Sequence, residues 1–522
     1  MAASISSKNE KRTSAFDDIF KHVSPFGKYQ QVLYFTSYLL AFPLISQFFL
    51  LVFGFGTPGF HCVTPNVTCD RKKCCDDCTS YEFDGPFHSI VSEWNLICDR
   101  AFLGATIQSC YFAGMLVGSI VTGILSDAWG RKKCIFICNA IMLVTGFGSA
   151  FVHSTPLFAV LRFLVGFGLT GVMLAHYIYV MELVGPSKRT AVANMGLFLV
   201  SGFQMLFLLI AYFERDWRNL TMIVTLPAVL LFPFWKFFPQ SPRWLIAHDR
   251  LDEAQTVIER FGGKKGKPVN SEELRALLEK VRKDQLERER EAKKYTPIDM
   301  FRTPKLRKWT IIICYQWFVV ALVGFGIFLF ISQLVGNLYV NYTIMNVITT
   351  LKIPLTWILY LRFGRRICHA IIMILVGITF LMFLLVYKES PEATTALSLC
   401  GYLMIDCSWT SVYLVTSELF PTVLRNTAQG TGSTTARIGG ILAPFVALTA
   451  QLPGLSIAFP VVIFAVVAAL AGILMYWIPE TVFSPMHQTI EETEVAEDYY
   501  GIPCCGKKPQ SPRPKSRQVI WL

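Results

Sequence analysis

The sequence predicts an all-helical membrane protein with twelve transmembrane helices arranged as two halves of six. Of the 522 residues, 53% are hydrophobic and only 16% are charged, whereas soluble proteins average about 25% charged residues. The mean hydropathy is +0.46. The apolar residues also fall in continuous blocks, and a helix needs roughly 20 such residues to cross a bilayer. Together these observations exclude a soluble or disordered protein.

The predicted spans fall into two sets of six. The N-terminal half, residues 30–238, holds the blocks 30–54, 101–125, 134–153, 157–183, 190–213 and 219–238. The C-terminal half, residues 309–478, holds the blocks 309–333, 338–361, 367–387, 395–416, 428–452 and 457–478. Residues 239–308 between them are amphipathic to fully polar and are expected to form short soluble helices. Residues 1–29 and 479–522 are expected to be polar termini.

Basic residues in the short loops predict the orientation, because cytoplasmic loops carry an excess of Lys and Arg. The loops on the opposite side hold Arg215, Arg218 and Lys388 beside acidic residues. The richer set holds Arg131, Lys132, Lys133, Lys188, Arg189, Arg362, Arg365, Arg366 and Arg425. Both termini and residues 239–308 are therefore expected in the cytoplasm. This distribution also explains the net charge of +12 without a nucleic-acid partner.

The loop 55–100 is then extracellular, and it is rich in cysteine. An even, clustered set of cysteines in an oxidising compartment predicts three disulfides, with the pairing left open. A zinc cluster is the alternative. Asn66 begins an Asn-Val-Thr sequon, which predicts glycosylation in the same loop. The cysteines are Cys62, Cys69, Cys74, Cys75, Cys78 and Cys98.

A Gly-Arg motif follows both the second and the eighth predicted span. The first copy contains Asp127, Gly130 and Arg131, and the second reads Gly364-Arg365-Arg366. Gly130 permits a tight turn, and Asp127 can face a cation or the positive end of a helix. Such a charge clasp can hold one conformation of a two-state carrier, and its recurrence indicates an internal repeat. Ordinary basic loops would explain the arginines but not the repeated spacing.

These motifs resemble the major facilitator superfamily and, within it, the organic ion transporters for organic cations, anions and carnitine. The likeness runs almost end to end. Thr57-Pro58-Gly59-Phe60-His61-Cys62 opens the cysteine loop and Ser92-Glu93-Trp94-Asn95 closes it. Further matches are Arg162-Phe163-Leu164-Val165-Gly166, Glu182 with Gly185-Pro186-Ser187-Lys188-Arg189, Asp216-Trp217-Arg218, Pro239 to Leu245, and Glu418-Leu419-Phe420-Pro421-Thr422 with Arg425-Asn426.

The resemblance implies a multi-pass carrier of the plasma membrane that works by alternating access. It also implies a cytoplasmic gate network formed by Asp127, Gly130, Arg131, Glu182, Arg243, Glu418 and Arg425. The chain departs from the family at Gln240, where Glu is usual. It departs again at Leu361 and Arg362, where an acidic residue usually precedes the second Gly-Arg-Arg.

Three ionisable residues fall inside predicted spans of the second half: Lys352, Asp406 and Arg437. Such residues are costly in a bilayer and are candidates for function. The resemblance places Arg437 where anion and carnitine transporters carry Arg, and Lys352 where relatives often carry an acidic residue. We therefore expect both to bind a carboxylate or sulfate. Asp406 is expected to pair with one of them, or else to bind an ammonium or carry a proton. His176 is the polar counterpart in the first half.

Three aromatic residues fall where the resemblance places the cavity lining: Trp317, Phe325 and Tyr413. They are expected to contact the apolar part of a substrate, with core packing as the alternative. The predicted function is secondary transport of small organic anions or zwitterions. A cation carrier that uses Asp406 and a non-transporting receptor or scaffold are the alternatives.

The sequence contains no enzymatic constellation, no phosphate-binding glycine loop and no metal-ligand spacing, so we expect no catalytic site, metal or cofactor. The expected partners are the organic ion and the lipid bilayer. Cys504-Cys505 is a candidate for palmitoylation. The terminal Ile520-Trp521-Leu522 fits a PDZ-type partner.

Overall fold

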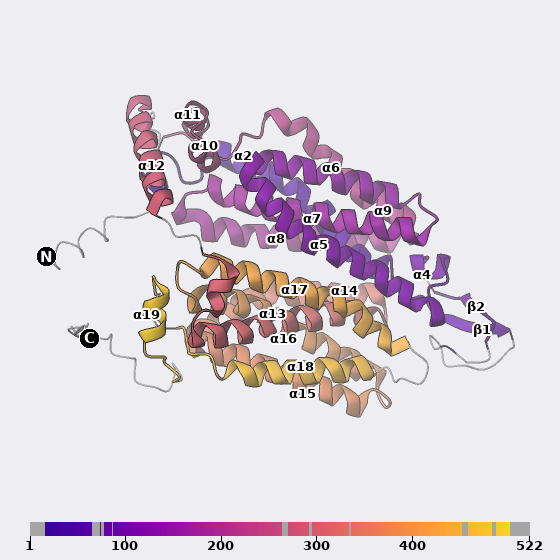
Figure 1. Ribbon diagram of the computed structural model, residues 1–522. Coiled ribbons are helices and arrows are strands. Elements are labelled where there is room, and N and C mark those ends of the chain that lie inside the picture. Colours follow the sequence, from indigo (N-terminus) through magenta and orange to yellow (C-terminus); the bar gives the residue numbers. More distant parts are fainter. Residues whose placement is uncertain are drawn as a thin grey trace. The chain divides into compact units, whose positions relative to one another are not determined.

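The computed structural model describes residues 16–64, 74, 78–85, 87–263, 270–291, 295–333, 336–451, 458–482 and 487–501. These residues are helical almost throughout. They divide into two compact units, unit 1 from Met1 to Lys294 and unit 2 from Tyr295 to Leu522. Each unit is an elongated helical bundle (Figure 1).

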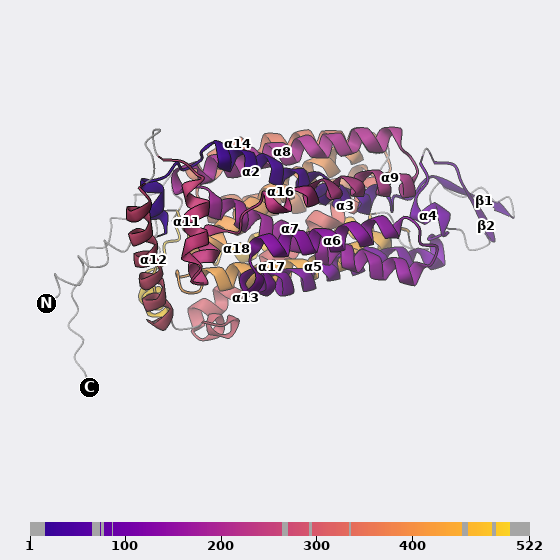
Figure 2. The same cartoon turned by 90° about the horizontal axis from the view of Figure 1, so that it is seen from above.

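Unit 1 contains six helical spans that run side by side (Figures 1 and 2). The first is made of α2 (Lys28–Ser37), η2 (Tyr38–Leu40) and α3 (Ala41–Phe53), and the sixth of α9 (Trp217–Thr225) and η4 (Leu226–Lys236). The four between them are α5 (Ala101–Trp129), α6 (Arg131–Ser149), α7 (Thr155–Leu183) and α8 (Pro186–Phe213). Glycines allow α5 and α7 to pack closely, since a Cβ at Gly114 would collide with the Phe163 backbone. Small residues at helix contacts are typical of membrane bundles.

The two ends of the unit 1 bundle carry different structures (Figure 1). One end carries a two-stranded antiparallel sheet of β1 (Phe60–Thr64) and β2 (Ser80–Phe83), followed by α4 (Ile90–Glu93). The other end carries α10 (Pro242–Ala247), α11 (Leu251–Glu259) and α12 (Ser271–Glu291). Ser241 caps α10 by accepting a hydrogen bond from the backbone of Trp244. The short helix η1 (Asp17–Lys21) packs on this end through Ile19 and Phe20.

Unit 2 begins with η6 (Pro297–Phe301) and α13 (Pro304–Phe330), which ends in η7 (Ile331–Gln333). The helices α14 (Leu338–Phe363), α15 (Arg365–Val386), α16 (Pro391–Leu419) and α17 (Arg425–Leu448) follow, and α17 ends in η8 (Thr449–Gln451). The last two are α18 (Phe459–Met475) and the short α19 (Ile490–Val495). Trp317 and Trp309 of α13 lie in the core of this unit.

The described helices confirm the predicted fold class. Eight are long and apolar enough to cross a membrane: the six of unit 1, with α13 and α15. The other four long helices of unit 2 complete the twelve predicted spans. Among them α14, α16 and α17 hold Lys352, Asp406 and Arg437, which lower their hydropathy, and α18 is short, with 17 residues.

Several helices run past the ends of the predicted apolar blocks. The second span, predicted to end at residue 125, continues to Trp129 and so includes Asp127. The tenth, predicted from 395 to 416, runs from Pro391 to Leu419 and includes Glu418. Hydropathy marks the apolar part of a span, whereas backbone hydrogen bonding carries a helix on until a breaker stops it. The stop after α5 is Gly130, at a φ of 92°.

Candidate functional site

Unit 1 holds a group of charged and polar side chains around the turn between α5 and α6, which we call the first clasp: Asp127, Arg131, Glu182, Gln240 and Ser241. Arg131 Nη1 lies 3.0 Å from Asp127 Oδ1, and Arg131 Nε lies 3.2 Å from Glu182 Oε2. Ser241 Oγ donates to the same Glu182 oxygen at 2.6 Å. Glu182 and Arg131 are largely buried and Asp127 is exposed. The clasp therefore joins the ends of α5, α6 and α7 to the segment after the sixth span.

Unit 2 repeats this arrangement in the second clasp: Arg365, Glu418, Glu480 and Thr481. Arg365 Nε lies 3.3 Å from Glu418 Oε2, and Thr481 Oγ1 donates to that oxygen at 2.6 Å. The turn before Arg365 is Gly364, again at a φ of 92°. Two glycines with the same unusual backbone, each followed by an arginine bound to a carboxylate, show that the repeat is structural.

One pair of positions differs in charge between the clasps. Gln240 Oε1 accepts the backbone N–H of Lys132 at 2.9 Å, and Glu480 Oε1 accepts that of Arg365 at 2.8 Å. Gln240 also donates through Nε2 to the Trp129 carbonyl at 3.4 Å. The residue that departs from the family pattern therefore keeps the hydrogen bond while losing the charge.

Ser241, Glu480 and Thr481 were not predicted for this network. The available signal is a repeated tripeptide after the last span of each half, Pro239-Gln240-Ser241 and Pro479-Glu480-Thr481. Two other residues predicted for this network, Arg243 and Arg425, make further contacts. The Arg243 guanidinium sits 5.8 Å from the Phe16 ring centroid, and Arg425 donates to the Thr422 hydroxyl at 3.4 Å.

Within unit 2, Lys352 of α14 and Asp406 of α16 form an ion pair. Lys352 Nζ also donates to the Asp406 backbone carbonyl at 3.1 Å. The two side chains are 13% and 15% exposed. Of the two partners proposed for Asp406 from the sequence, the structure places Lys352 against it.

Four aromatic side chains from α13 and α16 form a cluster: Trp317, Phe325, Trp409 and Tyr413. The Trp317 and Tyr413 rings meet edge to face with their centroids 4.3 Å apart, and the centroids of the Phe325 and Trp409 rings are 5.8 Å apart. Trp317 is fully buried and donates to Thr416 Oγ1 at 3.0 Å. Tyr413 is 46% exposed. In this conformation Trp317 forms the buried part of the cluster, and Tyr413 forms an exposed part of it.

Arg437 lies on α17 and is 7% exposed. Gly439 lies two residues after Arg437. A Cβ at Gly439 would collide with the Phe318 carbonyl of α13. A Cβ at Gly432 would likewise collide with the Trp317 ring. The close approach of α13 and α17 therefore places the aromatic cluster against the helix that carries Arg437.

His176 of α7 belongs to a polar and aromatic group inside unit 1. Its Nε2 lies 2.8 Å from Ser37 Oγ, and its ring packs edge to face on Tyr38 at 5.1 Å. Tyr34 donates from its hydroxyl to the Val192 carbonyl at 3.0 Å. Apart from the His176 imidazole, the named members of this group offer hydroxyls and aromatic rings, so it suits polar contacts more than ion pairing.

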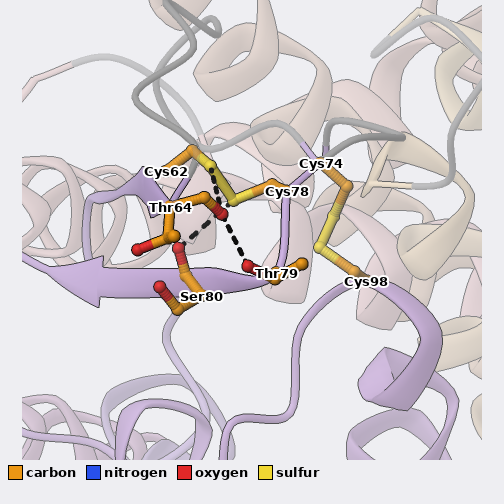
Figure 3. The surroundings of a disulfide bond; sticks show 7 residues. All are labelled: Cys62, Thr64, Cys74, Cys78, Thr79, Ser80 and Cys98. Carbon is orange, nitrogen blue, oxygen red and sulfur yellow. Dashed lines mark hydrogen bonds between the residues drawn. A yellow bond between two sulfur atoms is a disulfide. The ribbon is translucent and has the colours of Figure 1, made fainter.

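Figure 3 shows two disulfides in the loop after the first span. Cys62 pairs with Cys78 and Cys74 with Cys98. Cys62 sits on β1, which pairs with β2 in a register that opposes Cys62 to Tyr81. This register brings Cys78, just before β2, back to Cys62. Cys69, Cys75 and Asn66 lie outside the described residues.

The same loop is fastened to the start of α9 by an ion pair. Arg218 Nε lies 3.1 and 3.2 Å from the two Glu93 oxygens, and Trp217 Nε1 donates to Glu93 Oε2 at 2.8 Å. Burial alone would raise the pKa of Glu93. The hydrogen bonds from Arg218 and Trp217 and the nearby charges of Arg218 and His88 outweigh it, so this pKa is lowered. The contact holds the disulfide loop on the bundle of unit 1.

The comparisons with known proteins agree with this architecture. A family model described as "Sugar (and other) transporter" matches residues 60–493. The organic cation transporter protein of Drosophila melanogaster is 32% identical over 526 residues, covering 92% of this chain and 94% of that relative. Solute carrier family 22 member 6-B of Xenopus laevis is 30% identical over 449 residues, covering 84% of this chain and 80% of that relative. The chain belongs to solute carrier family 22.

A solved structure shares the fold. The xylose transporter XylE of E. coli, in an inward open conformation, aligns with a TM-score of 0.62 at 16% identity, covering 89% of this chain and 99% of that one.

As a member of solute carrier family 22, the chain is a multi-pass transporter of the plasma membrane and not an enzyme. The predicted membership of the major facilitator superfamily is confirmed. In the described residues, no three His, Cys, Asp or Glu side chains gather as a metal site.

Proposed function

We propose that this member of solute carrier family 22 moves small organic anions or zwitterions across the plasma membrane. The observation that carries the proposal is the ion pair between Lys352 and Asp406. Because these charges neutralise each other, the three ionisable residues singled out in the spans of unit 2 sum to one positive charge, that of Arg437. A guanidinium buried in a span, as that of Arg437 is, favours a substrate that brings a carboxylate or sulfate.

The surroundings of Arg437 suit an anion with an apolar body. Gly432, against which the Trp317 ring packs, lies five residues before Arg437 on α17, a distance of roughly 7.5 Å along a helix axis. A guanidinium and an aromatic cluster at that separation match an aryl or alkyl carboxylate. We assign Arg437 as the main anchor, Lys352 as a second one that the substrate reaches by displacing Asp406, and Tyr413 and Phe325 as apolar contacts.

The two clasps support transport by alternating access, with the termini in the cytoplasm. In each clasp an arginine at the start of one helix is ion-paired with a glutamate at the end of the next. Such contacts can break and re-form as units rock around a central site. A scaffold has no need of the same clasp in both units.

A cation carrier that uses Asp406 is the competing proposal, and it draws on relatives named organic cation transporter protein and organic cation/carnitine transporter 2. Because the Asp406 carboxylate is already paired with Lys352, a substrate that carries only a positive charge is disfavoured. A zwitterion remains compatible, since its carboxylate would bind Arg437 while its ammonium replaces Lys352 at Asp406.

Uptake by the purified full chain in proteoliposomes tests the proposal. The probes are 6-carboxyfluorescein, which carries carboxylates, and radiolabelled tetraethylammonium, a quaternary ammonium. We expect saturable uptake of the carboxylate and little of the ammonium. Saturable uptake of the ammonium alone would support the cation carrier, and no saturable uptake of the carboxylate would overturn the proposal.

A further inference from the structure

A hollow of about 560 Å³ lies in unit 1 beside the first clasp, between the end of α7, the start of α8 and Arg243 at the start of α10. Pockets that hold small ligands measure about 300–1,000 Å³. Its lining residues all belong to unit 1. Neither the clasp nor the proposed substrate site accounts for it.

Of the three charged side chains around the hollow, two have ion-pair partners in the described residues and one does not. Glu182 is held by Arg131 and Ser241. Arg189 is held by Asp17, at 2.8 Å from its Nη2, and donates from Nε to the Val184 carbonyl at 3.2 Å. Arg243 is exposed and contacts the Phe16 ring, and none of the carboxylates in the described ranges lies within ion-pair distance of it. The hollow therefore presents one guanidinium without a carboxylate.

The walls combine polar and apolar groups at helical spacing. Thr190 and Asn194 lie one turn apart on α8, and Tyr177 and Met181 lie one turn apart on α7. Residues four apart share one face of a helix. A ligand in the hollow would meet the hydroxyl and amide on one side and the ring and thioether on the other.

We propose that this hollow binds an amphipathic organic anion through Arg243. The guanidinium takes a carboxylate or phosphate in a two-pronged contact, Thr190 and Asn194 donate further hydrogen bonds, and Met181 and Tyr177 contact the apolar part. The anion has two sources, a soluble organic anion or the headgroup of an acidic phospholipid. Binding here requires no transport, so it goes beyond the proposed function.

Equilibrium binding of 6-carboxyfluorescein tests the site. The full chain is placed in phosphatidylcholine nanodiscs, and the anisotropy of the dye is measured in the Arg437→Gln background, which removes the proposed transport anchor. Adding Arg243→Gln is expected to weaken the remaining binding at least tenfold, and Arg243→Lys less. Arg260→Gln, an exposed arginine of the same unit outside the hollow, is the matched control and should change nothing. Melting temperatures show that each variant is folded.

The proposal is overturned if the Arg437→Gln protein binds no dye, or if Arg243→Gln leaves its binding unchanged. A second set of nanodiscs contains phosphatidylinositol 4-phosphate. Loss of Arg243-dependent dye binding there identifies the lipid headgroup as the occupant, and retention identifies a soluble anion. Because no step measures uptake, failure of the transport proposal and failure of this one are distinguishable.

Discussion

Gln240 and Glu480 occupy equivalent positions in the two clasps, and each accepts a backbone N–H from the start of the facing helix through Oε1, from Lys132 and Arg365 respectively, while Glu480 also accepts those of Thr481 and Val482. Only Glu480 does so with a charged group. A hydrogen bond to a charged acceptor contributes about 1.5–3 kcal/mol, against about 0.5–1.5 kcal/mol for a neutral pair. The first clasp is therefore expected to be the weaker of the two, by about 1 kcal/mol on this scale.

Exchanging these two residues should move stability in opposite directions. Gln240→Glu is expected to raise the melting temperature of the purified protein, because a carboxylate then accepts the Lys132 N–H. Glu480→Gln should lower it. A lower melting temperature for Gln240→Glu would show that the Trp129 contact from the glutamine amide matters more than charge.

The turn at Gly130 should reject any side chain. Its φ of 92° and ψ of 154° suit glycine alone, and a Cβ there would collide with the Gln240 amide. Gly130→Ala is expected to cost about 1–3 kcal/mol from backbone strain and to displace Gln240. Gly123→Ala, in the same helix with open space around it, should be neutral or slightly stabilising. Thermal unfolding of the two variants side by side is the measurement, and equal stability would contradict the account.

The pair of Lys352 and Asp406 should behave as a unit. Removing one partner of a buried ion pair costs about 3–5 kcal/mol, because the other charge is left uncompensated. Asp406→Leu and Lys352→Met are each expected to lower the melting temperature, and the double variant to recover most of the loss. If the double variant is as unstable as the sum of the single ones, the side chains do not act on each other. Carboxylate uptake should stay low in the double variant, since the second anchor is gone.

The contact between Glu93 and Arg218 should weaken in acid. The folded-state pKa of Glu93 is lowered, so its contribution to stability is present above its ordinary value of about 4.3 and is lost as the pH falls through the lowered one. Glu93→Gln is therefore expected to melt below the parent at pH 7, with the difference shrinking toward pH 4 and below. Glu82→Gln, exposed on β2, should show no such dependence. A difference that grows in acid would contradict a lowered pKa for Glu93.

The apolar blocks predicted the twelve spans well because burial in lipid is a property of composition. Helix ends were predicted less well, since the stop at Trp129 depends on the backbone of Gly130 rather than on hydropathy. Similarly, the cysteine loop was recognisable from spacing, whereas the pairing of Cys62 with Cys78 depends on the register of β1 and β2.

The functional residues divide in the same way. Arg131 and Glu182 belong to recognisable motifs, and the structure brings them together. The partner of Asp406 was left open because it depends on how α14 and α16 rotate against each other, which one chain's periodicity does not determine. Ser241 and Thr481 carry no charge, so nothing but their place after Pro-Gln and Pro-Glu marked them. Arg243 was assigned to the clasp by its motif, and its contact with Phe16 depends on how the N-terminal segment folds back.

Whether Arg437 anchors an organic anion is decided by uptake into proteoliposomes of Arg437→Gln and Asp406→Asn proteins, with 6-carboxyfluorescein and tetraethylammonium as probes. The account predicts that Arg437→Gln loses most carboxylate uptake, that Arg437→Lys recovers part of it, and that Asp406→Asn retains more than Arg437→Gln. Carboxylate uptake that survives Arg437→Gln, together with ammonium uptake that disappears in Asp406→Asn, would contradict it.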